Sequence, residues 1–276
     1  MVGGALLPGS VADRVAADYR RRLFGEATLQ ALPDRPRFVI NATNVQSGAL
    51  WRFSKPYMGD YRVGRVFDPE IEVAVAVAAS SAFPPVLSPM ELRLQDGAVR
   101  AGSGGDLEHP PFTTDVVLAD GGVYDNMGLE TAWKRYRTLY VSDAGARLSP
   151  EEEPRRDWAR HAYRVLDIVD NQVRSLRKRQ VVAAFQADAS DPSHRRGAYW
   201  GIGTAYDAYP ARSPLACPAE ATAELAAVPT RLKRLDERTQ ERLINWWYAV
   251  CDAAMRTHVD PNVPTPAAFP YPATGV

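Results

Sequence analysis

An apolar run that ends in an acid and two glycines constrains this chain more than any other feature. Residues 116–119 read Val-Val-Leu-Ala, and Asp120, Gly121 and Gly122 follow directly. A short apolar run of this kind predicts a buried strand, and the glycines predict a sharp turn after it. The sequence therefore delivers a carboxylate into a glycine turn, where it is held in place for chemistry. An ordinary turn after a strand uses the same residue types, so the motif alone does not decide between the two.

Composition excludes several classes of protein. The chain has 276 residues, and its 33 basic side chains balance its 33 acidic ones, so bulk charge gives no attraction to nucleic acid or to an acidic membrane. Cys217 and Cys251 form neither a disulfide framework nor a metal-binding pair. Residues 1–8 lack the basic start of a secretion signal, and no apolar stretch is long and uncharged enough to span a membrane. We expect a soluble or peripheral protein, cytoplasmic or at a membrane surface.

Periodicity and turn residues predict alternating helices and strands. The stretch from Asp68 carries a helix cap and many alanines, but Ile71, Val73, Val75 and Val77 alternate as in a strand; we interpret it as a helix. A hairpin is expected about Asp96-Gly97, and a loop over 101–111. The expected helices are 10–23, 68–83, 124–136, 157–185 and one from Thr230 or Asp236 to His258, and the expected strands are 37–43, 49–53, 62–67, 116–119, 138–143 and 198–204.

The order strand, helix, strand around Asp120 predicts a parallel sheet. We therefore expect an α/β fold of three layers, α/β/α, with a mostly parallel sheet. In the long helix 157–185 the side chains expected to face inward are Val165, Ile168 or Val169, Val173 and Leu176. No linker divides the chain, so one domain is predicted over 1–259, followed by a proline-rich, disordered tail over 260–276.

Three blocks in a fixed order carry a family resemblance. They are Asn41-Ala42-Thr43-Asn44, then Ala78-Ala79-Ser80-Ser81-Ala82-Phe83-Pro84-Pro85-Val86, then Asp120-Gly121-Gly122. Together they resemble the patatin-like phospholipase family. Residues 173–179 and 243–246 also look like the bacterial branch of that family, so the resemblance runs from about Phe24 to His258.

The resemblance implies a serine hydrolase of lipid acyl esters that uses a Ser-Asp dyad. Asp120 then takes the place of the proton acceptor, with Gly121 and Gly122 forming the turn that positions the acid. A carboxylate can serve as the base if it lies within hydrogen-bond reach of the serine hydroxyl. No metal and no organic cofactor is implied, and the expected partner is a lipid or other ester substrate, with peripheral membrane contact but no nucleic acid.

The sequence departs from the family at its nucleophile. A glycine-rich oxyanion loop and a Gly-x-Ser-x-Gly turn precede these blocks in the family, and neither occurs between Met1 and Ala119. Gly102-Ser103-Gly104-Gly105 lacks the preceding strand and following helix of such a turn, while Ser10, Ser80 and Ser81 are better interpreted as helix-end residues. The chain is therefore predicted to be the carboxyl-terminal part of a patatin-type domain, incomplete at its amino terminus and inactive as written. A parallel sheet shortened in this way would leave an apolar edge uncovered.

Three hypotheses remain open. The chain is part of a lipid acyl hydrolase that holds the base but not the nucleophile; or it is a non-catalytic remnant that binds lipid or protein; or it is an unrelated α/β domain in which Asp120 only makes a turn. Asp143, which ends the next strand, is a second candidate acid, although a structural role is favoured. The basic set Arg174, Arg177, Lys178 and Arg179 is more typical of a solvated helix face than of a membrane contact.

Overall fold

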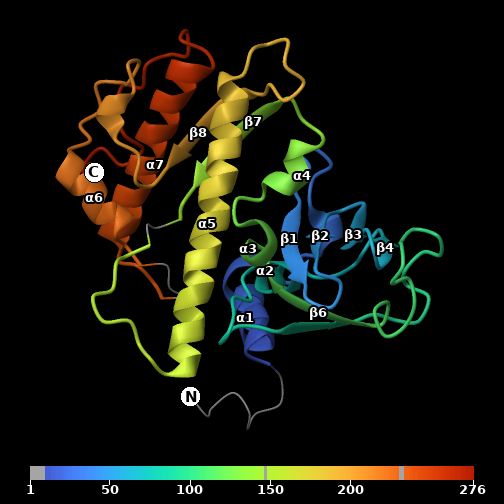
Figure 1. Ribbon diagram of the computed structural model, residues 1–276. Helices are drawn as coiled ribbons and strands as arrows, with labels where there is room; N and C mark the ends of the chain where they lie inside the picture. The colour runs from blue at the N-terminus through green and yellow to red at the C-terminus, as the bar shows by residue number, and fades with distance from the viewer. Residues whose placement is uncertain (1–9, 146–147, 230–232) are drawn as a thin grey trace. The chain divides into compact units, whose positions relative to one another are not determined.

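The computed structural model describes residues 10–145, 148–229 and 233–276. The chain divides into two compact units, Met1–Thr131 and Ala132–Val276 (Figure 1). Each unit has a hydrophobic core of its own. The first core includes Trp51, Phe53 and Leu118, and the second includes Trp200 and Trp246.

The first unit is built on a six-stranded sheet in which every neighbouring pair is antiparallel. The expected mostly parallel sheet is therefore wrong for the main sheet. Short turns join the first four strands, so each strand reverses the direction of the one before it. The apolar edge expected from a shortened parallel sheet therefore does not apply to this antiparallel sheet. The order is β4-β3-β2-β1-β6-β5, with β1 Ile40–Asn44, β2 Ala49–Phe53, β3 Tyr57–Asp60, β4 Gly64–Phe67, β5 Met90–Arg93 and β6 Asp115–Asp120.

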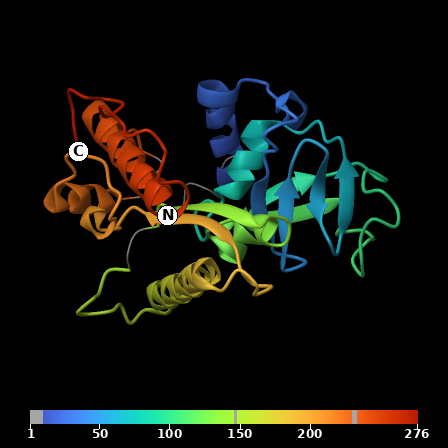
Figure 2. The ribbon, with the colours of Figure 1, turned by 90° about the horizontal axis from the view of Figure 1, so that it is seen from above.

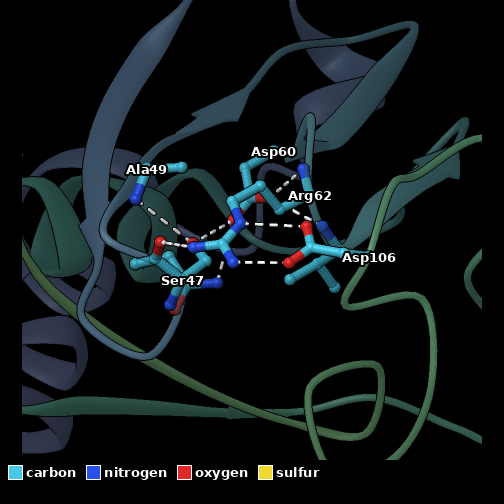
Figure 3. Close-up of polar contacts among 7 residues, drawn as sticks. Ser47, Ala49, Asp60, Arg62 and Asp106 are labelled. Atoms are coloured by element: carbon cyan, nitrogen blue, oxygen red, sulfur yellow. Dashed lines mark hydrogen bonds and ion pairs between the residues drawn. The ribbon is translucent and has the colours of Figure 1, made fainter.

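Two of these turns are tied together by Asp60, which is buried at the end of β3. Its carboxylate accepts hydrogen bonds from the Ser47 hydroxyl at 2.8 Å and from the backbone N–H of Arg62 at 2.8 Å (Figure 3). The Arg62 guanidinium in turn donates to the Ser47 carbonyl and forms an ion pair with Asp106. This network fixes the β1–β2 and β3–β4 turns against each other, because the buried carboxylate takes its donors from both turns and the Arg62 guanidinium adds a further bond between them.

The expected hairpin about Asp96-Gly97 is also wrong. The turn itself forms, with a positive φ of 78° at Gly97. The chain after this turn does not return along β5. Instead, the Arg100 N–H donates a hydrogen bond to the carbonyl of Arg65 in β4 at 2.9 Å. β5 pairs instead with β6, and Met90 lies opposite Leu118.

The predicted first helix is confirmed. In α1 (Val11–Tyr19) the Ser10 hydroxyl accepts from Asp13 N–H at 3.1 Å and the Asp13 carboxylate accepts from Ser10 N–H at 2.7 Å. One π-helical turn, Arg20–Phe24, continues it. This reciprocal capping box is what the sequence of the segment favours.

The second helix also forms, in preference to the alternating strand, but it starts later than predicted. α2 (Val73–Ser80) begins after Glu72, and Asp68 does not cap it. The reason is that the preceding residues are extended: the Ile71 carbonyl accepts from Leu29 N–H at 2.9 Å, and Thr28 bridges to Glu72.

The helix expected over 124–136 is divided in two. α3 (Gly122–Asp125) and α4 (Leu129–Trp133) are separated at Gly128, whose φ is 64°. A residue in this left-handed conformation ends a helix, and glycine takes it without the strain that a β-carbon brings.

The second unit has the three-layer architecture that was expected of the whole chain. Its two parallel strands are β7 (Thr138–Asp143) and β8 (Arg196–Gly201). Figure 2 shows α5 (Trp158–Gln186) and α7 (Glu237–His258) on opposite sides of them. Alternation along β8 explains this: Ala198 and Trp200 pack in the core with α7, while Tyr199 meets Lys178 of α5.

Two expectations about the helices and the tail are corrected in this unit. Asp236 caps α7 as predicted, and the alternative cap Thr230 lies outside the described residues. The face of α5 that was expected to point inward is exposed: the exposed fraction is 46% for Val165, 37% for Val173 and 56% for Leu176. The segment 260–276 is ordered. The buried Asn245 of α7 holds it by donating to the carbonyls of Tyr271 at 2.9 Å and Gly275 at 2.7 Å.

Candidate active site

Asp120 is the last residue of β6 and is half-buried. Its main chain is fixed from two sides, because its N–H donates to the Ala82 carbonyl at 2.9 Å and its carbonyl accepts from the Thr43 hydroxyl at 2.7 Å. Its carboxylate accepts the N–H of Gly122 at 2.6 Å. The acid is therefore held in one orientation without being sealed in the core, as a proton acceptor must be.

Steric contacts explain the glycine at 121 and, less strictly, the glycine at 122. Gly121 has ordinary helical dihedrals, φ −59° and ψ −28°, so the turn does not depend on positive φ. A β-carbon at 121 would instead collide with the Asn41 carbonyl on β1. At 122 it would lie 3.0 Å from Oδ1 of Asp120. The first glycine lets β1 approach the turn, and the second keeps bulk off the carboxylate.

The family blocks that precede Asp120 in the sequence surround it in the structure. Asn41 and Thr43 lie on β1, where Ala42 is directly opposite Asp120. The Ser80 carbonyl at the end of α2 accepts from Gly121 N–H at 3.2 Å. The Thr131 hydroxyl donates to Oδ1 of Asn41 at 3.1 Å, and the same hydroxyl oxygen of Thr131 accepts from Arg52 Nε at 3.2 Å. Three segments distant in sequence thus converge on one turn.

Sequence reasoning missed a second acid in this turn. Asp125 is only 3% exposed, and its Oδ2 accepts the N–H of Glu130 at 2.6 Å, which fixes the start of α4. Its Oδ1 is buried without a hydrogen-bond partner among the described residues. The available signal was an acid shortly before Gly128 and a new helix, a spacing typical of a side chain that caps the next helix.

The hydroxyls of three candidate serines, Ser10, Ser81 and Ser103, make local hydrogen bonds. The Ser81 hydroxyl donates to the Val77 carbonyl at 2.8 Å within its own helix, and the Ser10 hydroxyl caps α1. The Ser103 hydroxyl donates to the Arg100 carbonyl at 2.6 Å and accepts from Arg65 N–H at 2.9 Å. Ser103 therefore lies beside β4, and β3, β2 and β1 separate that strand from β6.

The remaining candidates lie in the second unit or form no site. Asp143 ends β7, and its carboxylate accepts from the Tyr199 hydroxyl at 2.6 Å. No group of three His, Cys, Asp or Glu side chains suited to a metal ion occurs in the part of the chain that the structure describes. None of the helices placed there is long and apolar enough to cross a bilayer.

Comparison with known protein families bears on the first unit. Residues 4–133 match the family described as Patatin-like phospholipase. This segment is a patatin-like phospholipase domain. The match ends within two residues of the boundary at Thr131, so sequence family and compact unit coincide. No curated protein and no solved structure matches the chain.

The patatin-like match corrects the extent of the resemblance. It lies in the amino-terminal part of the chain, whereas the resemblance was traced as far as His258. It lends no support to the prediction that an amino-terminal portion of the domain is missing. It does include all three sequence blocks and Asp120, and the family description implies lipid esters as substrates.

Proposed function

We propose that the patatin-like unit provides the base of a lipid acyl ester hydrolase, with Asp120 as the proton acceptor. The observation that carries the proposal is the half-buried Asp120 carboxylate, fixed by Gly122 N–H at 2.6 Å within the segment that matches the family. The convergence of the three family blocks on this turn supports it, because β1 and the end of α2 hold the main chain on both sides of the carboxylate through the Thr43 hydroxyl and the Ala82 and Ser80 carbonyls.

In the proposed reaction Asp120 accepts the proton of a serine hydroxyl as the serine oxygen attacks the ester carbonyl. The alcohol leaves with that proton, and an acyl-serine remains. Asp120 then accepts a proton from water, which attacks the acyl group, and the fatty acid is released as the serine recovers its proton. Backbone N–H groups must stabilise the oxyanion in both steps.

We further propose that the serine and the oxyanion donors belong to a polypeptide segment outside this sequence. The sequence before Asp120 holds no Gly-x-Ser-x-Gly turn, and the Ser10, Ser81 and Ser103 hydroxyls already serve local structure. Contact with a membrane surface remains part of this proposal, because the substrates that the family description implies are lipid esters.

The lack of such a turn also favours a second function. The chain is then a remnant of the fold that binds lipid or protein without turnover. In that case Asp120 only stabilises its turn, and Asp120→Asn leaves every binding property unchanged.

Covalent labelling of the purified chain tests the missing nucleophile. Fluorophosphonates modify activated serines, so we expect no mass increase after incubation and no hydrolysis of a short-chain phosphatidylcholine. A single labelled serine whose replacement by alanine abolishes hydrolysis would contradict this part of the proposal. Asp120→Asn serves as the matched variant, since a genuine dyad would lose labelling with it.

A further inference from the structure

The second unit contains a cavity of about 990 Å³ at the carboxyl ends of β7 and β8. α5 forms one wall and α6 (Ala219–Ala226) forms another. The carboxyl ends of parallel strands are where α/β folds bind ligands, and the volume lies in the range of small-molecule sites. No family match covers this region, so its chemistry must be inferred from its lining.

The wall formed by α5 is polar and basic. Asn171, Arg174, Ser175 and Lys178 line the cavity, and their spacing of three and four residues places them on one face of the helix. Lys178 Nζ lies 4.8 Å from the centre of the Tyr199 ring, which holds its ammonium group over the floor of the cavity. This face differs from the exposed apolar one that includes Val173 and Leu176.

Asp143 is the one carboxylate among the described residues of the lining, and it already accepts hydrogen bonds. Asp143 accepts from Gly145 N–H at 2.9 Å through Oδ1 and from the Tyr199 hydroxyl at 2.6 Å through Oδ2. Burial, reinforced by the hydrogen bond and charge of Asp143, raises the pKa of Tyr199 far above its usual value, so the phenol is neutral. Among the described residues of the lining, Arg174 and Lys178 are the cations and Asp143 is the carboxylate, so their formal charges sum to a positive value.

A glycine keeps the basic end open. A β-carbon at Gly145 would overlap the Arg174 guanidinium in its present position beside Asp143, so a larger residue would make that flexible side chain move. At Gly201 a β-carbon would lie 3.3 Å from both the Asp143 carbonyl and the Tyr199 hydroxyl, which is tight but short of a collision, so this position is less restrictive.

The opposite wall is apolar. α6 and the residues after it contribute Ala219, Ala223, Ala226, Ala227 and Val228, and Ile202 adds a branched side chain from the end of β8. Thr222 of α6 also lines this wall, but its hydroxyl donates to the Ala219 carbonyl at 3.0 Å, so the surface is largely apolar. The cavity thus has a cationic side and an apolar side.

We propose that this cavity binds a single-chain anionic amphiphile, with its head group on Arg174 and Lys178 and its chain along α6. A fatty acid carboxylate and a monoacyl phosphate share this chemistry. The inference rests on the second unit alone and stands whether or not Asp120 acts as a base.

Calorimetric titration of the whole chain with four probes below their micellar concentrations tests this. Decanoate and decyl phosphate supply both features, decyl maltoside supplies the chain without the charge, and inorganic phosphate supplies the charge without the chain. We expect saturable binding of one or both anionic amphiphiles, with the tighter of the two identifying the head group, and weaker binding of the other two probes. Equal binding of decyl maltoside, or no binding of either anionic amphiphile, would overturn the proposal.

Variants locate the site. Lys178→Gln should weaken binding about tenfold, since it removes one charged contact. Arg179→Gln, one residue along the same helix and outside the lining, is the matched control and should leave affinity unchanged. Ala223→Phe should block the chain without altering charge. Circular dichroism and thermal unfolding of each variant establish that it folds, and a folded Lys178→Gln variant with unchanged affinity would overturn the assignment.

Discussion

Gly121 shows how one residue ties the candidate acid to the sheet. Its Cα faces the Asn41 carbonyl so closely that no β-carbon fits, whereas at Gly122 the nearest atoms belong to the side chains of Asp120 and Asn126. We predict that Gly121→Ala lowers the free energy of unfolding by about 1–3 kcal/mol, and more than Gly122→Ala, since backbone yields less than side-chain ends. Urea unfolding of both variants measures this; an equal or reversed order would contradict the close contact.

Glu108 gives a pH-dependent prediction at the same scale. Its carboxylate accepts the N–H groups of Gly102 and Gly104, each at 2.5 Å, and these bonds lower its pKa below the usual value of 4.5. A lowered pKa in the folded state means that the stabilisation is complete above the unfolded pKa and is lost as pH falls through the folded pKa.

The melting temperatures of the wild type and Glu108→Gln should therefore differ most near neutral pH and converge below about pH 4. Glu91→Gln, at an exposed position of β5, is a control for loss of one negative charge. A gap between wild type and Glu108→Gln that is constant from pH 7 to pH 3 would exclude the carboxylate as its source.

Individual elements were predictable where local chemistry decides them. The Ser10 capping box, the Asp157 and Asp236 caps and the strand that ends at Asp120 all follow from side chains close in sequence. The predictions were wrong where a contact with a segment distant in sequence decides the bounds or the pairing of an element. The start of α2 depends on Leu29, and the pairing of β5 depends on how the chain after Gly97 meets Arg65.

Asn245 of α7 anchors the carboxyl-terminal segment 260–276. Asn245 makes three hydrogen bonds to it, two as donor and one from Tyr271 N–H at 2.9 Å. Asn245→Ala should release residues 260–276 and lower stability by about 1–3 kcal/mol, because buried backbone groups lose their partner. Hydrogen exchange should then increase at Tyr271 and Gly275. Unchanged exchange there would contradict the packing, and Asn262→Ala, on an exposed turn, is the control.

At the scale of the whole molecule, the mostly parallel sheet predicted from the strand–helix–strand order is wrong because that order does not apply to the strands of the first unit. The parallel pair β7–β8 obeys that order. The strands β1 to β4 are joined by turns too short for a crossover, as the glycine at position 48 indicates for the first of these turns, so they pair antiparallel. The acid, its glycines and the three blocks around them were nonetheless predictable, because each is a local pattern.

The two hydrophobic cores share no residue, since one draws on residues 12–118 and the other on residues 198–276. We predict that residues 1–131 expressed alone unfold cooperatively, with tryptophan fluorescence that reports the buried Trp51. A fragment without a cooperative transition would show that the patatin-like unit depends on the rest of the chain.

The central claim is that Asp120 is a base awaiting a serine, and complementation tests it most directly. The chain is mixed with a polypeptide that carries the glycine loop and Gly-x-Ser-x-Gly turn of a patatin-like protein, and release of fatty acid from phospholipid is measured. We predict turnover that Asp120→Asn reduces at least about a hundredfold, while Asp115→Asn at the other end of β6 does not. Turnover that is indifferent to Asp120→Asn would contradict the account.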